Sequence, residues 1–291
     1  MAPPVSGPET PTLFDPAAGP EGIAGPTARV AMVIAYHGAP FHGFAVNAGV
    51  RTVGGDLTVA LGKLLGHPVE LTVAGRTDKG VHARANVVTF DARAEGLDPE
   101  ALVAALNKML QPAIAVRSAR VVGDDVDARF SAVARTYRYL VCNRPVPDPF
   151  LADRAWFIET PLDLAVLRLA CDPFLGTHDF SSFCRRPKRT DGAEADLRRR
   201  VERAEWSDQD DGLLRFEIRA NAFCHQMVRS VVGFMVEVGS GRRSVGEIPA
   251  VLRARDRQAV GGRLAPPQGL VLWEVDFGDR HAEVAAEAGR G

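Results

Sequence analysis

The order in which short apolar strands and amphipathic helices follow one another is the strongest constraint on the fold. Five segments in the first half have the apolar, β-branched character of strands: residues 29–36, 69–74, 84–91, 114–122 and 133–142. Helical spacing of apolar residues occurs at 56–65, and Asp98 followed by Pro99 predicts a second helix that runs to about residue 109. Strands and helices therefore mix in this half without strict alternation.

The second half of the chain mixes the two kinds of element in similar proportions. Strands are expected at residues 155–158, 200–207, 213–220 and 271–277, and helices at residues 162–174, 223–238 and 247–254. A cluster of prolines at 145, 147 and 149 separates the halves, so we divide the folded part into residues 29–144 and 145–278. The pattern predicts an α+β architecture with two related subdomains.

The two ends of the chain differ from this folded part. Residues 1–28 are rich in proline and carry only acidic charges, which predicts a disordered tail, and the small polar residues 279–291 are expected to fray. The whole chain has a net charge of −1, whereas residues 29–278 hold 33 basic and 30 acidic residues. The basic excess lies in residues 185–203 and 242–263, which are suited to a phosphate backbone but also resemble an ordinary solvated face.

Several classes of protein find no support in the sequence. The four cysteines form no C-x-x-C pair, which argues against zinc-ribbon and thioredoxin motifs, and their wide separation fits a reducing cytoplasm. No apolar run approaches the length of a transmembrane helix, and the first residues lack the features of a signal peptide. Phosphate-loop, dinucleotide-binding, zinc-protease and serine-hydrolase motifs are also missing.

The most informative segment is a polar loop at residues 74–83, between two predicted strands. Glycines at both ends permit a tight turn, and Asp78 lies between the cations Arg76 and Lys79. A carboxylate between two cations is expected to stay ionised, and an ionised carboxylate can act as a nucleophile. The alternative is a simple hairpin turn in which the aspartate bonds to its own backbone.

Two further segments carry candidate functional residues. Arg135, Tyr137 and Tyr139 share one face of a predicted strand, where a tyrosine can stack on a nucleobase or pair with another aromatic ring across the sheet. The predicted helix at 223–238 is apolar on most sides and is therefore expected to be buried. Arg229 on this helix then needs an anion, for which Asp78 would be suitable, although another acid or an extended route to water would also satisfy it.

Taken together, these segments resemble the TruA family of tRNA pseudouridine synthases. The resemblance covers roughly residues 29–277, and its motifs occur in family order: GRTDKGVHA at 75–83, RFSA at 129–132, RTYRY at 135–139, NAF at 221–223 with MVR at 227–229, and GL at 269–270. The sequence departs from the family pattern at His37 and Phe44, which stand in Tyr-His-Gly and Gly-Phe-Ala, and at Lys79.

The resemblance implies a role for each matching residue. Asp78 would be the catalytic aspartate, and Arg229 the basic residue that pairs with it. Tyr137 would pack on the target base and is a candidate for proton transfer at C5. Two further residues would bind substrate: Arg76, which would help to extrude the nucleotide, and Leu270. The candidates for contact with the RNA backbone are Lys79, His82, Arg185, Arg186 and Arg189.

The resemblance also implies an activity and a fold. The family isomerises uridine to pseudouridine at positions 38, 39 and 40 of tRNA, in the anticodon stem-loop, without a cofactor or metal. Its members are cytoplasmic homodimers. Their fold is a mixed, mainly antiparallel sheet in two ferredoxin-like halves flanked by helices, with the active cleft between them.

Three alternatives remain at this stage. The first is a relative that acts on another uridine or another RNA, and the second is a catalytically silent RNA-binding protein. A glycosidase or phosphatase based on Asp78 would need a second carboxylate or a metal cluster, and no residue spacing suggests either.

Overall fold

The first part of the chain forms a unit with the order strand, helix, strand, strand, helix, strand. The computed structural model describes residues 23, 25–186, 195–262 and 264–285. The elements of this unit are β1 (Thr27–Tyr36), α1 (Val53–Leu65), β2 (Thr72–Val73), β3 (His82–Arg93), α2 (Pro99–Leu110) and β4 (Ile114–Val122). The strands pair antiparallel in the order β4-β1-β3-β2, which is the ferredoxin-like arrangement.

The second part repeats this arrangement with other elements. Its strands and main helices are β5 (Ala134–Cys142), α3 (Leu164–Leu169), β8 (Arg198–Asp208), β9 (Leu213–Ala220), α4 (Met227–Gly239) and β10 (Leu270–Asp276). The strand order β10-β5-β9-β8 is again antiparallel throughout. The shorter elements around them are β6 (Trp156–Phe157), β7 (Gly176–Asp179), α5 (Ile248–Ala254), α6 (Arg257–Val260), α7 (Ala282–Ala285), and the 3-10 turns η1 (Pro149–Leu151), η2 (Asp172–Phe174), η3 (Ser181–Phe183), η4 (Val245–Glu247), η5 (Pro267–Gly269) and η6 (Asp279–His281).

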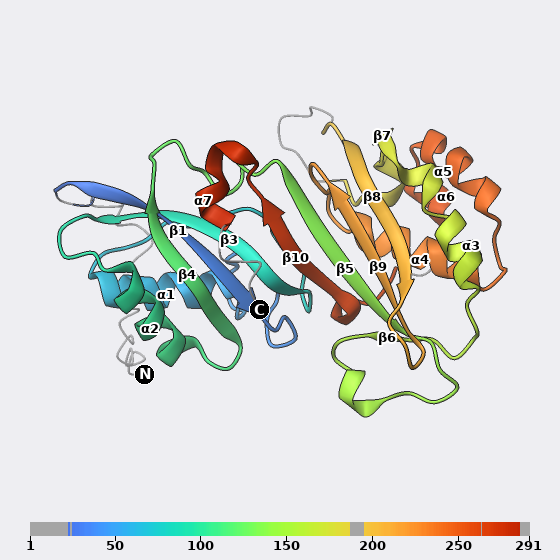
Figure 1. Cartoon of the computed structure of the whole chain (residues 1–291), viewed down its shortest axis with the longest axis horizontal. Helices are drawn as coiled ribbons and strands as arrows, with labels where there is room; N and C mark the ends of the chain where they lie inside the picture. Colours follow the sequence, from blue (N-terminus) through green and yellow to red (C-terminus); the bar gives the residue numbers. More distant parts are fainter. Residues whose placement is uncertain (1–22, 24, 187–194, 263, 286–291) are drawn as a thin grey trace, which may run out of the picture.

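A parallel pairing of β3 with β10 joins the two units into one sheet. Its order is β4-β1-β3-β10-β5-β9-β8-β7, with β2 beside β3 and β6 beside β5. Figure 1 shows α1 and α2 against the first unit and α3 to α6 gathered on the second. The mixed, mainly antiparallel sheet in two ferredoxin-like halves is confirmed. The topology divides the chain between β4 and β5, however, and not at the proline cluster after residue 144, because β5 opens the second unit.

Local signals account for most helix boundaries. Asp98 accepts hydrogen bonds from the backbone of Glu100 and Ala101, with Pro99 in the first turn, as predicted. α4 begins four residues later than predicted, because Gln226 adopts a left-handed conformation with φ of 66°. The helix predicted for residues 162–174 is split into α3 and η2, and the strand predicted for 69–74 contributes only the two residues of β2.

Burial explains the position of α4 and of the C-terminus. α4 is buried on nearly all sides, as its apolar sequence predicts. The prediction that residues 279–291 fray is wrong for the first part of that segment, because η6 and α7 are ordered and Val284 is only 1% exposed. Most of the predicted tail at residues 1–28 lies outside the described residues, and β1 already begins at Thr27. None of the helices in the described part of the chain has the length and apolar character needed to span a bilayer.

A buried arginine at the start of β5 ties together the segments that surround the junction of the two units. The guanidinium of Arg135 donates to the carbonyl oxygens of Ala74 at 3.0 and 3.2 Å, of Ala132 and Asn221 at 3.0 Å, and of Arg129 at 2.8 Å. These carbonyls belong to the end of the β2 segment, the β4–β5 connection and the loop after β9. The planar fork of arginine suits this task because it presents five N–H groups in fixed directions.

The substitution Arg135→Lys tests this function of Arg135. Lysine keeps the charge but has only three donors, so some of the buried carbonyls lose their partner. We expect the free energy of unfolding, measured by urea denaturation, to fall by about 2 kcal/mol or more. Arg253→Lys, on the exposed side of α5, is the matched control and should change it by less than about 0.5 kcal/mol. Equal effects of the two substitutions would contradict the assignment.

Candidate functional site

The polar loop between β2 and β3 is held in a defined shape by its neighbours. The Thr77 hydroxyl hydrogen-bonds the Tyr36 hydroxyl at 2.8 Å, and the backbone N–H of Phe44 donates to the carbonyl oxygen of Thr77 at 3.1 Å. Phe44 departs from the family pattern, yet its backbone supports the loop directly. The N–H of Val81 closes the turn onto the carbonyl oxygen of Asp78 at 3.1 Å.

The glycines at both ends of the loop are needed for this shape. A Cβ atom on Gly75 would lie 2.9 Å from the Leu272 side chain on β10 and 3.5 Å from the Tyr137 hydroxyl, so only glycine allows this close approach. Gly80 has φ of +80°, in the left-handed region that favours glycine. The loop therefore passes tightly against the strands of the second unit.

The Asp78 carboxylate points toward the second unit and contacts two of its side chains. Nη1 of Arg229 lies 3.2 Å from Oδ2, and Nε2 of His225 lies 3.3 Å from Oδ1. The side chains of Arg229 and Asp78 are only 12% and 25% exposed. The prediction that the buried arginine of α4 pairs with Asp78 is confirmed, and the interpretation of the loop as a simple self-bonded turn is wrong. Arg229 is also held by its Nε donor to the carbonyl oxygen of Ala265 at 2.8 Å.

Sequence analysis did not assign His225 to this contact. A signal was present, because His225 precedes Arg229 by four residues, a spacing that places two side chains on one helix face. His225 in fact lies just ahead of α4, in the turn before Gln226, and reaches Asp78 from there.

Tyr137 lies beside Asp78 at the inner wall of the site. Its side chain is buried and packs edge-on against the Phe223 ring, with 4.9 Å between the ring centroids. Burial raises the pKa of the Tyr137 hydroxyl, and the neighbouring Tyr36 and Asp78 raise it further, so this hydroxyl stays protonated. Tyr139 on the same strand face belongs to the core, where its hydroxyl donates to the carbonyl oxygen of Pro266 at 2.8 Å.

These side chains surround a pocket of about 1080 Å³ to which both units contribute. The first unit supplies the loop of residues 73–79, and the second supplies Tyr137, the segment 222–229 and Leu270. Such a volume is ample for a nucleoside. Among the residues that the structure describes, no three His, Cys, Asp or Glu side chains come together in the manner of metal ligands.

The predicted RNA-backbone contacts differ in where they lie. Lys79 and Arg185 are exposed and line the pocket, as does Arg76, which was predicted to bind substrate. Arg186 is exposed but does not line it; its guanidinium lies 3.4 Å from the carbonyl oxygen of Arg255. Arg189 lies outside the described residues.

The structure gives His82 a different role from the predicted RNA contact. His82 is buried at the start of β3, where its Nδ1 accepts the backbone N–H of Gly38 at 3.0 Å and its ring lies 4.7 Å from that of His37. Burial, assisted by His37, lowers the pKa of His82, which disfavours the cation that a phosphate contact needs. His37, the other departure from the family pattern, contacts Asp153 with 2.8 Å between Nε2 and Oδ2.

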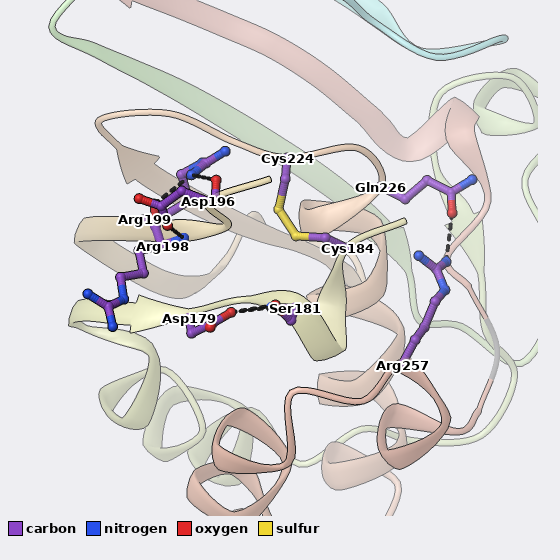
Figure 2. The surroundings of a disulfide bond; sticks show 9 residues. All are labelled: Asp179, Ser181, Cys184, Asp196, Arg198, Arg199, Cys224, Gln226 and Arg257. Carbon is purple, nitrogen blue, oxygen red and sulfur yellow. Dashed lines mark hydrogen bonds between the residues drawn. A yellow bond between two sulfur atoms is a disulfide. The ribbon is translucent and has the colours of Figure 1, made fainter. Parts of the chain in front are cut away.

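A disulfide bond lies beside the pocket. Cys184, after η3, is bonded to Cys224, in the turn before α4, with 5.8 Å between the Cα atoms (Figure 2). Cys224 itself lines the pocket. Forty residues separate the two cysteines in sequence, so their spacing contained no indication of the bond. Cys142 and Cys171 are buried and unbonded.

The chain is similar to a family of known proteins over most of its length. The family model of tRNA pseudouridine synthase matches residues 32–131 and 170–278. Proteins named tRNA pseudouridine synthase A are similar over 86% of this chain: that of Neisseria meningitidis serogroup B at 40% identity over 92% of its own length, that of Bacillus velezensis at 39% over 99%, and that of Listeria monocytogenes serotype 4a at 36% over 99%. The matched segments contain the Asp78 loop, Arg229 and Leu270, and the chain belongs to the tRNA pseudouridine synthase family.

Proposed function

We propose that this isomerase converts uridine to pseudouridine in the anticodon stem-loop of tRNA, at positions 38, 39 and 40, with Asp78 as the nucleophile. The observation that carries the proposal is the Asp78 carboxylate itself. It is three-quarters buried at the wall of a nucleoside-sized pocket, and one of its oxygens is paired with the nearly buried Arg229.

The reaction needs a group that attacks, and a site that retains the detached base. The N1–C1′ bond of the nucleotide breaks, a C5–C1′ bond forms, C5 loses its proton and N1 takes up a proton. An ionised carboxylate can attack C6 of the base or C1′ of the ribose, and in either case it leaves again as a carboxylate. Arg229 places a positive charge 3.2 Å from Oδ2 of Asp78, opposite the negative charge of the attacking carboxylate.

The entrance of the pocket suits a base that has been extruded from a stem. Arg76, Lys79 and Arg185 are exposed cations around it, where they can contact the phosphates on either side of the target nucleotide. Base flipping is required because C1′ and C6 of a stacked nucleotide are out of reach of a side chain in a pocket.

Tyr137 supports the base from within. Its buried ring, steadied by Phe223, offers a stacking surface next to Asp78. The raised pKa of its hydroxyl favours a role as a stacking surface and hydrogen-bond donor over a role as a tyrosinate that removes the C5 proton.

The substitution Asp78→Asn tests the nucleophile. An amide cannot attack carbon as a carboxylate does, so we expect tritium release from tRNA labelled at uridine C5 to slow by at least about a thousandfold. Asp211→Asn is the matched control, because Asp211 is also paired with an arginine, Arg144 at 2.7 Å, and lies on the exposed surface.

The same assay separates the alternatives. No tritium release by the wild-type protein would contradict the enzymatic proposal and favour a silent RNA-binding protein. Release by Asp78→Asn at the wild-type rate would contradict the assignment of Asp78. Mapping of the modified uridines in the wild-type product then decides the target positions.

The pH dependence of the rate tests the state of Tyr137. Below its pKa, the ionised fraction of a tyrosine rises about tenfold per pH unit, so a tyrosinate mechanism would accelerate by that factor. Because the pKa of Tyr137 is raised, we expect the single-turnover rate to vary by less than about threefold from pH 8 to 9.5. A tenfold rise per unit would contradict this expectation, and Tyr137→Phe, which keeps the ring, would then identify the hydroxyl responsible by abolishing the rise.

We also propose that the protein acts in the cytoplasm as a homodimer, as the family resemblance implies. Light scattering of the purified protein should then report twice the chain mass of 31.3 kDa. A mass of one chain that stays the same when the protein concentration is raised would contradict the dimer.

A further inference from the structure

The Asp78 carboxylate is held by two different side chains, one on each oxygen. Arg229 contacts Oδ2 and His225 contacts Oδ1, at 3.2 and 3.3 Å. We propose that His225 is a positioning residue: from a turn anchored to the body of the second unit, the close approach of its Nε2 to Oδ1 sets the orientation of the Asp78 carboxylate. This inference rests on the proposed role of Asp78 as the nucleophile.

A second contact is needed because one hydrogen bond does not fix the carboxylate. The last torsion of an aspartate side chain is broad and roughly two-fold, so the oxygens can turn about the Cβ–Cγ bond. The Arg229 hydrogen bond to Oδ2 leaves Oδ1 free to rotate, whereas the His225 ring 3.3 Å from Oδ1 restricts this rotation. A nucleophile that is fixed before the substrate binds reacts faster, because less reorganisation remains to be done.

The backbone around His225 is anchored at three consecutive residues. The carbonyl oxygen of His225 accepts the N–H of Arg185 at 2.9 Å. Figure 2 shows the other two tethers: Cys224 is bonded to Cys184, and the side-chain oxygen of Gln226 accepts from Arg257 at 2.6 Å. Gln226 is held in a left-handed conformation that ends this turn and precedes α4. The three tethers come from the chain after η3 and from α6, so they attach the turn to the body of the second unit.

Although its backbone is anchored, the side chain of His225 is 46% exposed. A substitution at this position therefore leaves no cavity in the core, and variants are expected to fold. The exposure also raises the competing explanation that His225 contacts the RNA, since it lines the pocket together with Arg76 and Arg185. The two explanations differ in what they change: a positioning residue affects the rate of the bound complex, whereas an RNA contact affects binding.

The test compares His225→Phe with His225→Gln. Phenylalanine keeps a ring without a donor, whereas the amide of glutamine retains an N–H. We expect His225→Phe to lower the single-turnover rate of tritium release at saturating tRNA about tenfold, with the Kd for tRNA changed by less than about twofold, and His225→Gln to recover most of the rate. A raised Kd with an unchanged saturating rate, or a glutamine variant as slow as phenylalanine, would overturn the proposal.

A second measurement detects the contact without using activity. Diethyl pyrocarbonate modifies unprotonated imidazole nitrogen, and peptide mass spectrometry reports the modification of His225 separately from that of the other six histidines. We expect His225 to react severalfold faster in Asp78→Ala than in the wild-type protein, because Nε2 loses its partner. Equal reactivity would show that the contact does not exist. An inactive wild-type protein with faster labelling in Asp78→Ala would instead overturn only the proposed function.

Discussion

The guanidinium of Arg135 is the interaction on which the arrangement of the site depends. It donates to four backbone carbonyl groups: the buried ones of Ala74, directly before the Asp78 loop, and Ala132, and the part-buried ones of Arg129 and Asn221, the last directly before the turn with His225. A buried carbonyl left without a donor destabilises the folded state by about 1–3 kcal/mol, so moving these segments apart would lower the free energy of unfolding. One side chain of β5 thus links the segment before the Asp78 loop to the segment before the turn with His225.

The site itself exists because two similar units meet. Each unit has the order βαββαβ, and the parallel pairing of β3 with β10 brings the loop of the first unit against α4 of the second. Asp78 comes from the first unit, whereas Arg229, His225 and Tyr137 come from the second. Opposite charges on separate units also explain why a nearly buried arginine is tolerated at the junction, because each charge there has its partner.

Much of this arrangement could be predicted from local sequence signals. The glycines around the loop, the cap formed by Asp98 and the alternation of the strands each reflect a preference of a few neighbouring residues, and the structure agrees with them. The partner of Arg229 followed from a general energetic argument, that a cation on an apolar helix needs an anion. The start of α4 did not, because the left-handed Gln226 depends on contacts made around its turn.

The sequence by itself determined the mixed α+β fold, and it indicated the polar loop at residues 74–83 and Asp78 as a suitable partner for Arg229. Only the tertiary structure decided that His82 is buried, that His225 completes the contacts of Asp78 and that Cys184 bonds to Cys224. The physical reason is the range of the interactions. Turn chemistry, caps and apolar periodicity act over a few residues and can be recognised in the chain, whereas burial and the meeting of side chains far apart in sequence arise only when the sheet is assembled.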